Sequence, residues 1–163
     1  MKKIMVIGCP GSGKSTFSRE LHKITDIPVF HLDRMYWNAD KTVVDGDIFQ
    51  ERLLSAIREE RWIIDGNYGT SIELRLQACD TVFFLDYPLE VCLEGVHERK
   101  GKVRSDISWT EPAQEEDEEF IEFIKKYREV SRPAVLELLD KYPDRNIYIF
   151  KNRDEANEYL SKL

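Results

Sequence analysis

The sequence predicts an α/β fold of three layers, in which helices cover both faces of a five-stranded parallel sheet. Three observations carry this prediction. Short apolar runs alternate along the chain with stretches of helical spacing. Most of these runs are apolar throughout, as strands of a parallel sheet are when both faces are covered. Polar residues suited to chemistry follow several of the runs, where the carboxyl edge of an open sheet binds ligands.

Five runs are expected to form strands. They are 3–8 (KIMVIG), 28–32 (PVFHL), 61–65 (RWIID), 81–86 (TVFFLD) and 146–150 (NIYIF). A stretch with helical spacing lies between each strand and the next, so right-handed crossovers make the strands parallel.

Helices are expected at 14–24, 47–59, 71–78, 89–100, 115–140 and 154–162. In the fifth of these, an apolar stripe with spacings of three and four residues is expected to pack in the core: Phe120, Phe123, Ile124, Tyr127 and Val130. Pro133 is expected to kink or restart this helix, because its ring clashes with the preceding turn.

The chain of 163 residues shows no repeat, linker or break in composition, which predicts one domain over 1–163. No apolar run approaches the roughly 18 residues that cross a membrane, so we expect no membrane span and a cytoplasmic protein. Three cysteines without a CxxC pair suggest reduced thiols and no zinc site. The net charge of −7 argues against direct nucleic-acid binding. The oligomeric state is left open.

The segment GCPGSGKST follows the first strand and precedes the first helix. Gly8, Gly13, Lys14 and Ser15 satisfy the pattern G-x-x-x-x-G-K-[ST] in that context. The glycines let backbone N–H groups curl around an anion, and the helix N-terminus adds its dipole. Lys14 supplies charge for the β- and γ-phosphates and Ser15 a hydroxyl for Mg²⁺. The expected nucleotide-binding residues are Gly8, Pro10, Gly11, Ser12, Gly13, Lys14, Ser15 and Thr16.

Among P-loop proteins, a GTPase would need an N-K-x-D motif, and KNRD at 151–154 has the wrong order. A motor or AAA-type ATPase usually has a longer chain. A compact kinase remains, with ATP and Mg²⁺ as expected cofactors.

Five segments then resemble the adenylate-kinase-like P-loop kinases, and in particular the group of DNA topology modulation (FlaR-type) proteins. They are VIGCPGSGKSTFSREL, PVFHLDRMYW, RWIIDGNYGTSIELRL, DTVFFLDYP and GKVRSD. The resemblance implies a nucleoside-kinase-like P-loop NTPase fold and an ATP-dependent phosphotransferase. The group's name comes from an effect on DNA supercoiling and identifies no acceptor.

Two carboxylates at strand ends receive roles from this resemblance. Asp33 follows the second strand, where an acid of related kinases lies near the acceptor or the magnesium waters. The alternative for Asp33 is a turn cap. Asp86 ends the fourth strand at the place of a Walker-B metal ligand, and its alternative is a cap before Pro88.

The segment DGNYGTSIELR resembles the acceptor-binding segment of nucleotide kinases, which reads D-G-F-P-R. Asn67 and Tyr68 replace the Phe-Pro pair, and the next basic residue is Arg75. This departure argues against AMP-like acceptors. The expected substrate-binding residues are Asp33, Asp65, Gly66, Asn67, Tyr68 and Arg75.

The basic segment HERKGKVRSD corresponds in these kinases to the start of a lid, expected here over 99–114. Arg99 and Arg104 would reach the transferring oxygens, with Arg128 and Arg132 approaching from the next helix. A solvated helix end is the alternative. Arg153 falls where related kinases pack the adenine.

The sequence thus predicts a kinase that transfers the γ-phosphoryl group of ATP to an unidentified small molecule or nucleotide. Lys14, Asp33 and the lid arginines are the expected catalytic residues. The alternative is an ATP-dependent regulatory switch linked indirectly to DNA topology.

Overall fold

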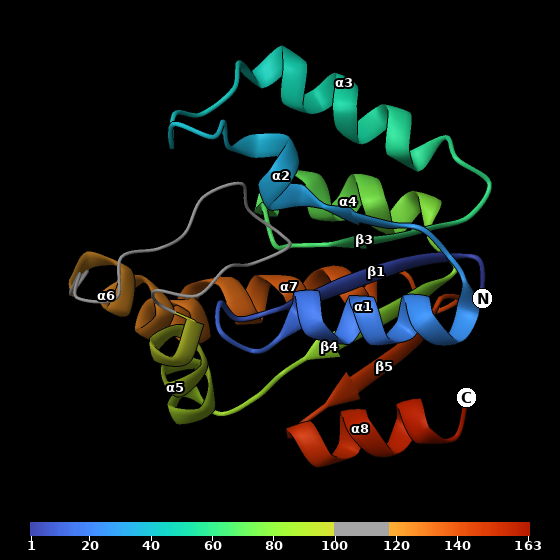
Figure 1. Cartoon of the computed structure of the whole chain (residues 1–163). Coiled ribbons are helices and arrows are strands. Elements are labelled where there is room, and N and C mark those ends of the chain that lie inside the picture. The colour runs from blue at the N-terminus through green and yellow to red at the C-terminus, as the bar shows by residue number, and fades with distance from the viewer. Residues whose placement is uncertain (100–117) are drawn as a thin grey trace.

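A computed structural model of the chain describes residues 1–99 and 118–163. Its core is one sheet of five parallel strands in the order β2-β3-β1-β4-β5 (Figure 1). The strands are β1 (Lys3–Gly8), β2 (Val29–His31), β3 (Trp62–Asp65), β4 (Thr81–Leu85) and β5 (Asn146–Phe150). The predicted fold class is confirmed, and each strand lies within two residues of its expected bounds.

Helices lie on both faces of this sheet. They are α1 (Lys14–Thr25), α2 (Leu32–Tyr36), α3 (Gly46–Ile57), α4 (Gly69–Ala78), α5 (Leu89–Arg99), α6 (Glu118–Lys126), the π-helix η1 (Tyr127–Ser131), α7 (Arg132–Asp140) and α8 (Arg153–Ser161). Helices α1 and α8 cover one face, and α3, α4 and α7 cover the other (Figure 1).

The central strand β1 divides its side chains between two apolar cores. Ile4 and Val6 belong to the core under α1 and α8, whereas Met5 and Ile7 belong to the core under α3, α4 and α7. All four are completely buried. Burying one such side chain contributes about 1.5–3 kcal/mol to the stability of the fold. Because β1 packs its side chains into both cores, it anchors the centre of the sheet. This double burial explains why the strands read as continuous apolar runs.

The sequence did not predict α2, which begins at Leu32 where a strand was expected to end. Helix α2 has five residues, too few to show a helical period. This short helix turns the chain away from the sheet directly after β2 and places Asp33 in its first turn.

The long helix expected over 115–140 is described from Glu118 and is interrupted by η1. Pro133 lies at the start of α7, where the missing N–H costs no hydrogen bond. The preceding turn widens to a π-helix, so the predicted disruption at Pro133 is confirmed.

The prediction that the whole apolar stripe of this helix packs in the core is wrong. Ile124 and Tyr127 are buried, whereas Phe123 is 53% exposed and Val130 is 68% exposed. The π-helical turn shifts the register of side chains within the stripe, which takes Val130 off the buried face. The side chain of Phe120 lies outside the described residues.

Helix α5 contacts the loop after β1 backbone to backbone. A Cβ atom on Gly95 would overlap the carbonyl group of Gly11, and a Cβ atom on Gly11 would overlap the carbonyl oxygen of Cys92. Glycine at both positions lets α5 approach the loop this closely. In the described parts of the chain, no helix has the length and apolar character needed to span a membrane.

We expect Gly95→Ala to destabilise the fold by about 1–3 kcal/mol, the usual cost of overpacking a close contact. The new Cβ atom cannot be accommodated without moving α5 or the loop at Gly11. Urea unfolding followed by circular dichroism measures the change. Gly46→Ala on α3 is the control, because a Cβ atom there meets nothing within 4 Å. Equal stability of the two variants would contradict the backbone contact.

Candidate functional site

A cleft of about 1610 Å³ opens at the carboxyl edge of the sheet. Its walls include the loop after β1, the start of α1, helix α2, the loop after β3, and parts of η1, α7 and α8. Asp33, Asp65 and Asn67 line this cleft together with the glycine-rich loop. The prediction that polar groups after separate strands share one edge is therefore confirmed for these residues.

The loop after β1 forms a cradle at the N-terminus of α1. Gly11 and Gly13 have φ angles of 84° and 95°, in the left-handed region that favours glycine. These two turns let the N-terminus of α1 face the cleft, where its backbone N–H groups and dipole attract an anion. The side-chain oxygen of Ser12 is buried and has no hydrogen-bond partner among the described residues. Seven of the predicted nucleotide-binding residues line the cleft: Pro10, Gly11, Ser12, Gly13, Lys14, Ser15 and Thr16.

The backbone of Gly8 is held by two side chains. Asn67 accepts a hydrogen bond from the Gly8 N–H (3.2 Å) and donates one to the Gly8 carbonyl oxygen (2.6 Å). Lys14 donates to the same carbonyl oxygen (3.0 Å) and to that of Cys9 (3.2 Å). Asn67 was expected to contact a substrate. Its side-chain amide instead positions the backbone of Gly8, where the glycine-rich loop begins. Lys14 is held across the mouth of the cradle.

Arg75 does not line the cleft, although it was expected to contact the acceptor. Its side chain is completely buried. The guanidinium donates to the carbonyl oxygens of Gly66 (2.8 Å) and Asn67 (2.6 Å). Burial lowers the pKa of Arg75 below its ordinary value, and the nearby carboxylate of Asp65 opposes this shift. Arg75 therefore supports the loop after β3 from below and is not placed to hold an acceptor phosphate.

Asp33 and Tyr68 form a hydrogen-bonded pair at the cleft. The Tyr68 hydroxyl donates to Oδ1 of Asp33. Burial, and then the Asp33 carboxylate, raise the pKa of Tyr68, while a hydrogen bond with Trp37 acts in the opposite direction. Tyr68 therefore remains a proton donor to the carboxylate. Its φ of 33° is rare for a bulky residue, and such backbone strain clusters at functional sites.

Asp65 pairs with His31, a residue that the sequence analysis did not identify. The Nδ1 atom of His31 lies 2.6 Å from Oδ2 of Asp65, and the two side chains are 9% and 5% exposed. Strands β2 and β3 are neighbours, with His31 opposite Asp65 in the register. The pairing depends on strand order, which the sequence pattern does not specify.

Asp86 lies outside the cleft, which differs from its expected role as a metal ligand. Arg132 donates to both its oxygens (2.7 and 2.8 Å), and Lys151 donates to Oδ2 (2.8 Å). Burial acts to raise the pKa of Asp86, but the bonds from Arg132 and Lys151 hold it below its ordinary value. The ion pair joins the ends of β4 and β5 to the start of α7. Arg132, expected to reach a phosphoryl group, is bound to this carboxylate instead.

The other arginines predicted for the site lie in different places. Arg128 donates to the carbonyl oxygen of Tyr87 (2.8 Å), and Arg153 lines the cleft beside Gly95. Arg104 and the predicted lid beyond residue 99 lie outside the described residues, as does the side chain of Arg99.

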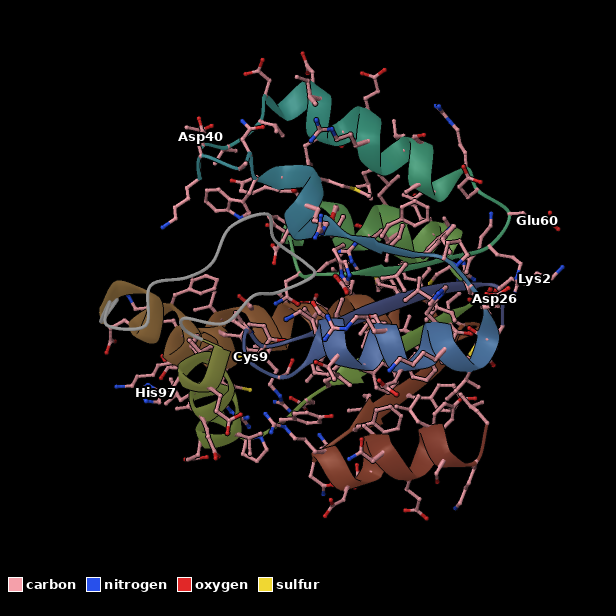
Figure 2. The ribbon with its side chains drawn as sticks, in the orientation of Figure 1. Lys2, Cys9, Asp26, Asp40, Glu60 and His97 are labelled. Atoms are coloured by element: carbon pink, nitrogen blue, oxygen red, sulfur yellow. The ribbon has the colours of Figure 1, made fainter. Side chains whose placement is uncertain are left out.

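Cys9, Cys79 and Cys92 are free and buried. Cys9 belongs to the glycine-rich loop and lies on its α5 side (Figure 2), in the same apolar cluster as Cys92 and Val96. A hydrogen bond with Cys92, followed by burial, raises the pKa of the Cys9 thiol. The thiol therefore stays protonated and serves as a small apolar contact.

Several cleft residues were missed by the sequence analysis. The cleft is also lined by Arg19, Arg34, Tyr36 and Trp37. The dipeptide YW, which begins three residues after Asp33, was the available signal, but placing it in the cleft requires the unpredicted helix α2. Across the described ranges 1–99 and 118–163, no group of three His, Cys, Asp or Glu side chains is placed to hold a metal ion.

Comparison with known proteins identifies the fold. Neither a family model nor a curated protein matches the chain. Shikimate kinase from Acinetobacter baumannii, solved with shikimate, superposes with a TM-score of 0.63 at 15% identity, covering 99% of this chain and 90% of that one. Shikimate kinase from Bacteroides thetaiotaomicron gives 0.61 at 19% identity, covering 98% and 94%.

Deoxyadenosine kinase from M. mycoides, solved with bound dATP, gives a TM-score of 0.56 at 20% identity, covering 98% of this chain and 97% of that one. The chain therefore has the P-loop kinase fold seen in these structures. The finer resemblance to FlaR-type proteins is not confirmed by these comparisons.

We expect Asp86→Asn to lower the free energy of unfolding by about 1–3 kcal/mol at neutral pH, because Arg132 and Lys151 lose their shared charged acceptor. The folded-state pKa of Asp86 is depressed, so its contribution is complete above the unfolded pKa of about 4 and disappears as pH falls through the lower folded pKa. Urea unfolding across pH measures this.

Asp144→Asn is the matched control, since Asp144 pairs with Arg145 but is 74% exposed. We expect a change below about 0.5 kcal/mol for this surface pair. A stability difference between Asp86→Asn and the parent that persists unchanged at pH 2 would contradict the ion-pair argument.

Proposed function

We propose that this chain is an ATP-dependent kinase that transfers the γ-phosphoryl group to a hydroxyl of a small molecule. The observation that carries the proposal is the placement of the P-loop cradle and Asp33 on the walls of one cleft. One wall offers an anion site with a lysine, and the other offers a carboxylate held by a tyrosine hydroxyl. The shared fold with shikimate and deoxyadenosine kinases supports the same reading.

On the donor side, the backbone N–H groups of the loop and Lys14 would bind the phosphates. Ser15 lines the cleft at the N-terminus of α1 and would supply a hydroxyl ligand to Mg²⁺. The residues fit this ion, because Mg²⁺ keeps several waters and needs few protein ligands when phosphates are bound. When bound, Mg²⁺ would supply positive charge beside the phosphate oxygens. Arg153 borders this side of the cleft, where we propose contacts to the nucleotide.

On the acceptor side, Asp33 would take the proton of the attacking hydroxyl as a general base. The hydrogen bond from Tyr68 fixes the carboxylate in one orientation. Asp65, Gly66 and Tyr68 would border the acceptor, since all three line the cleft. We also propose that Arg99 and Arg104 contact the phosphoryl group during transfer.

Lys14→Ala should lower phosphoryl transfer by about 10²–10³-fold, the usual loss when one group that stabilises transition-state charge is removed. Calorimetry with an ATP analogue and an ADP-release assay measure binding and turnover. Lys23→Ala is the control on the same helix, because its side chain is 69% exposed and pairs with Glu20. Equal activity of the two variants would exclude the P-loop as the donor site.

Asp33→Asn should leave ATP affinity nearly unchanged and lower transfer by roughly 10²–10⁴-fold, the usual contribution of a general base. Asp47→Asn, exposed at the start of α3, controls for the loss of one carboxylate. Normal transfer by Asp33→Asn would remove this residue from the mechanism. A parent protein that hydrolyses ATP without any acceptor and forms a stable complex with a partner would favour the regulatory switch instead.

A further inference from the structure

Three aromatic side chains form a wall of the cleft beside Asp33. Tyr36, Trp37 and Tyr68 all line the cleft and are half-buried. The ring centroid of Tyr36 lies 5.1 Å from that of Trp37 and 4.7 Å from that of Tyr68. We call these three residues the aromatic wall. Because all three rings line the cleft, a flat apolar ligand that enters it would stack on them.

The aromatic wall is held in place before any ligand arrives. Phe49 of α3 packs against Tyr36 (5.6 Å between centroids) and Tyr68 (5.5 Å) without lining the cleft. The backbone N–H of Trp37 donates to the carbonyl oxygen of Asp33 (3.0 Å), and Trp37 also pairs with Val43 in an antiparallel bridge. Binding on such a rigid surface loses little conformational entropy.

Tyr68 connects the aromatic wall to the carboxylate. Its ring packs in the wall, and its hydroxyl donates to Asp33. A ligand that stacks along this ring therefore extends at one end to the Asp33 carboxylate. A molecule with a planar ring and a hydroxyl a short distance away satisfies both contacts.

The charges beside the aromatic wall favour an acceptor without a phosphate of its own. The carboxylate of Asp33 lines this part of the cleft and would repel an anion. Asp65 also lines the cleft but is hydrogen-bonded to His31. Arg75 and Arg132, the arginines expected for an acceptor phosphate or the transferring group, are bound by protein oxygens. Arg34 lines the cleft but is exposed, so water screens its charge.

The volume of the cleft leaves room for a second ligand of this size. At about 1610 Å³ it exceeds the roughly 300–1,000 Å³ of a typical small-molecule site. A nucleotide on the P-loop would fill only part of it.

We propose that the phosphoryl acceptor is a nucleoside, whose base stacks on the aromatic wall and whose sugar hydroxyl is phosphorylated beside Asp33. This inference rests on the proposed kinase function. The sugar oxygen forms a bond to the γ-phosphorus, the bond from that phosphorus to the β–γ bridging oxygen breaks, and ADP leaves. The hydroxyl proton passes to the carboxylate of Asp33.

ADP release by the full chain with MgATP tests the acceptor class. The probes are deoxyadenosine, cytidine and thymidine, compared with ribose, shikimate and deoxyadenosine 5′-monophosphate. We expect the best nucleoside to exceed all three comparison compounds in kcat/KM by about tenfold or more, from stacking of its base. A higher kcat/KM for ribose, shikimate or the monophosphate would overturn the nucleoside proposal and leave the kinase function intact.

Calorimetry separates failure of the acceptor proposal from failure of the kinase proposal. A non-hydrolysable ATP analogue with Mg²⁺ should bind, and each nucleoside is then titrated into that complex. Analogue binding with no nucleoside binding up to about 1 mM would overturn the acceptor class alone. Absence of analogue binding would overturn the kinase function and the inference that depends on it.

Trp37→Leu should raise the KM for the best nucleoside by about tenfold and leave the KM for ATP unchanged, because one stacking face is lost. Trp37→Phe retains an aromatic face and should recover most of the affinity. Tyr148→Leu is the control, since Tyr148 is a partly exposed aromatic residue on β5 outside the cleft. Thermal unfolding checks that each variant folds. Equal KM values for Trp37→Leu and Tyr148→Leu would overturn the stacking role.

Discussion

The two hydrogen bonds between Asn67 and the backbone of Gly8 are the constraint on which the site depends. They join the last residue of β1 to the loop that follows the neighbouring strand β3. The Gly8 carbonyl oxygen also accepts a hydrogen bond from the Lys14 ammonium, which the Cys9 carbonyl oxygen holds as well. Arg75 holds the carbonyl of Asn67 from beneath. The cradle and the loop that follows β3 are therefore built as one hydrogen-bonded unit, and their relative placement follows from the pairing of β1 with β3.

Charged groups that resemble catalytic residues in sequence are used here to hold the scaffold. Asp86 is saturated by Arg132 and Lys151, and Arg75 is saturated by backbone carbonyls. A buried charge must be paired or hydrogen-bonded, and these groups satisfy that requirement with protein partners. Lys14, Asp33 and Asp65 line the cleft. Asp86 also directly follows a strand, so a position at a strand end does not by itself separate the two sets; their contacts in the fold do.

Much of the fold was predictable because its signals are local. The strands carry uninterrupted apolar runs, and the P-loop pattern fixes the turn into α1. Helix α2 was not predicted, because five residues are too few to show a helical period. The positions of Tyr36 and Trp37 in the cleft could therefore not be predicted either. The pair of His31 with Asp65 requires knowledge that β2 lies beside β3, and the exposure of Val130 requires the π-helical turn. Each of these depends on contacts between distant segments or on a change of helical register, which sequence spacing alone does not encode.

The contact between Gly11 and Gly95 also determines how stiffly two parts of the molecule are coupled. Packing through side chains is compliant, because rotamers can adjust when one element shifts. No side chain lies between these two backbones, and the carbonyl groups of Gly11 and Cys92 fill the space that a Cβ atom would need. A displacement of α5 therefore moves the backbone of Gly11 in the glycine-rich loop. The shape of the glycine-rich loop and the position of α5 thus depend on each other.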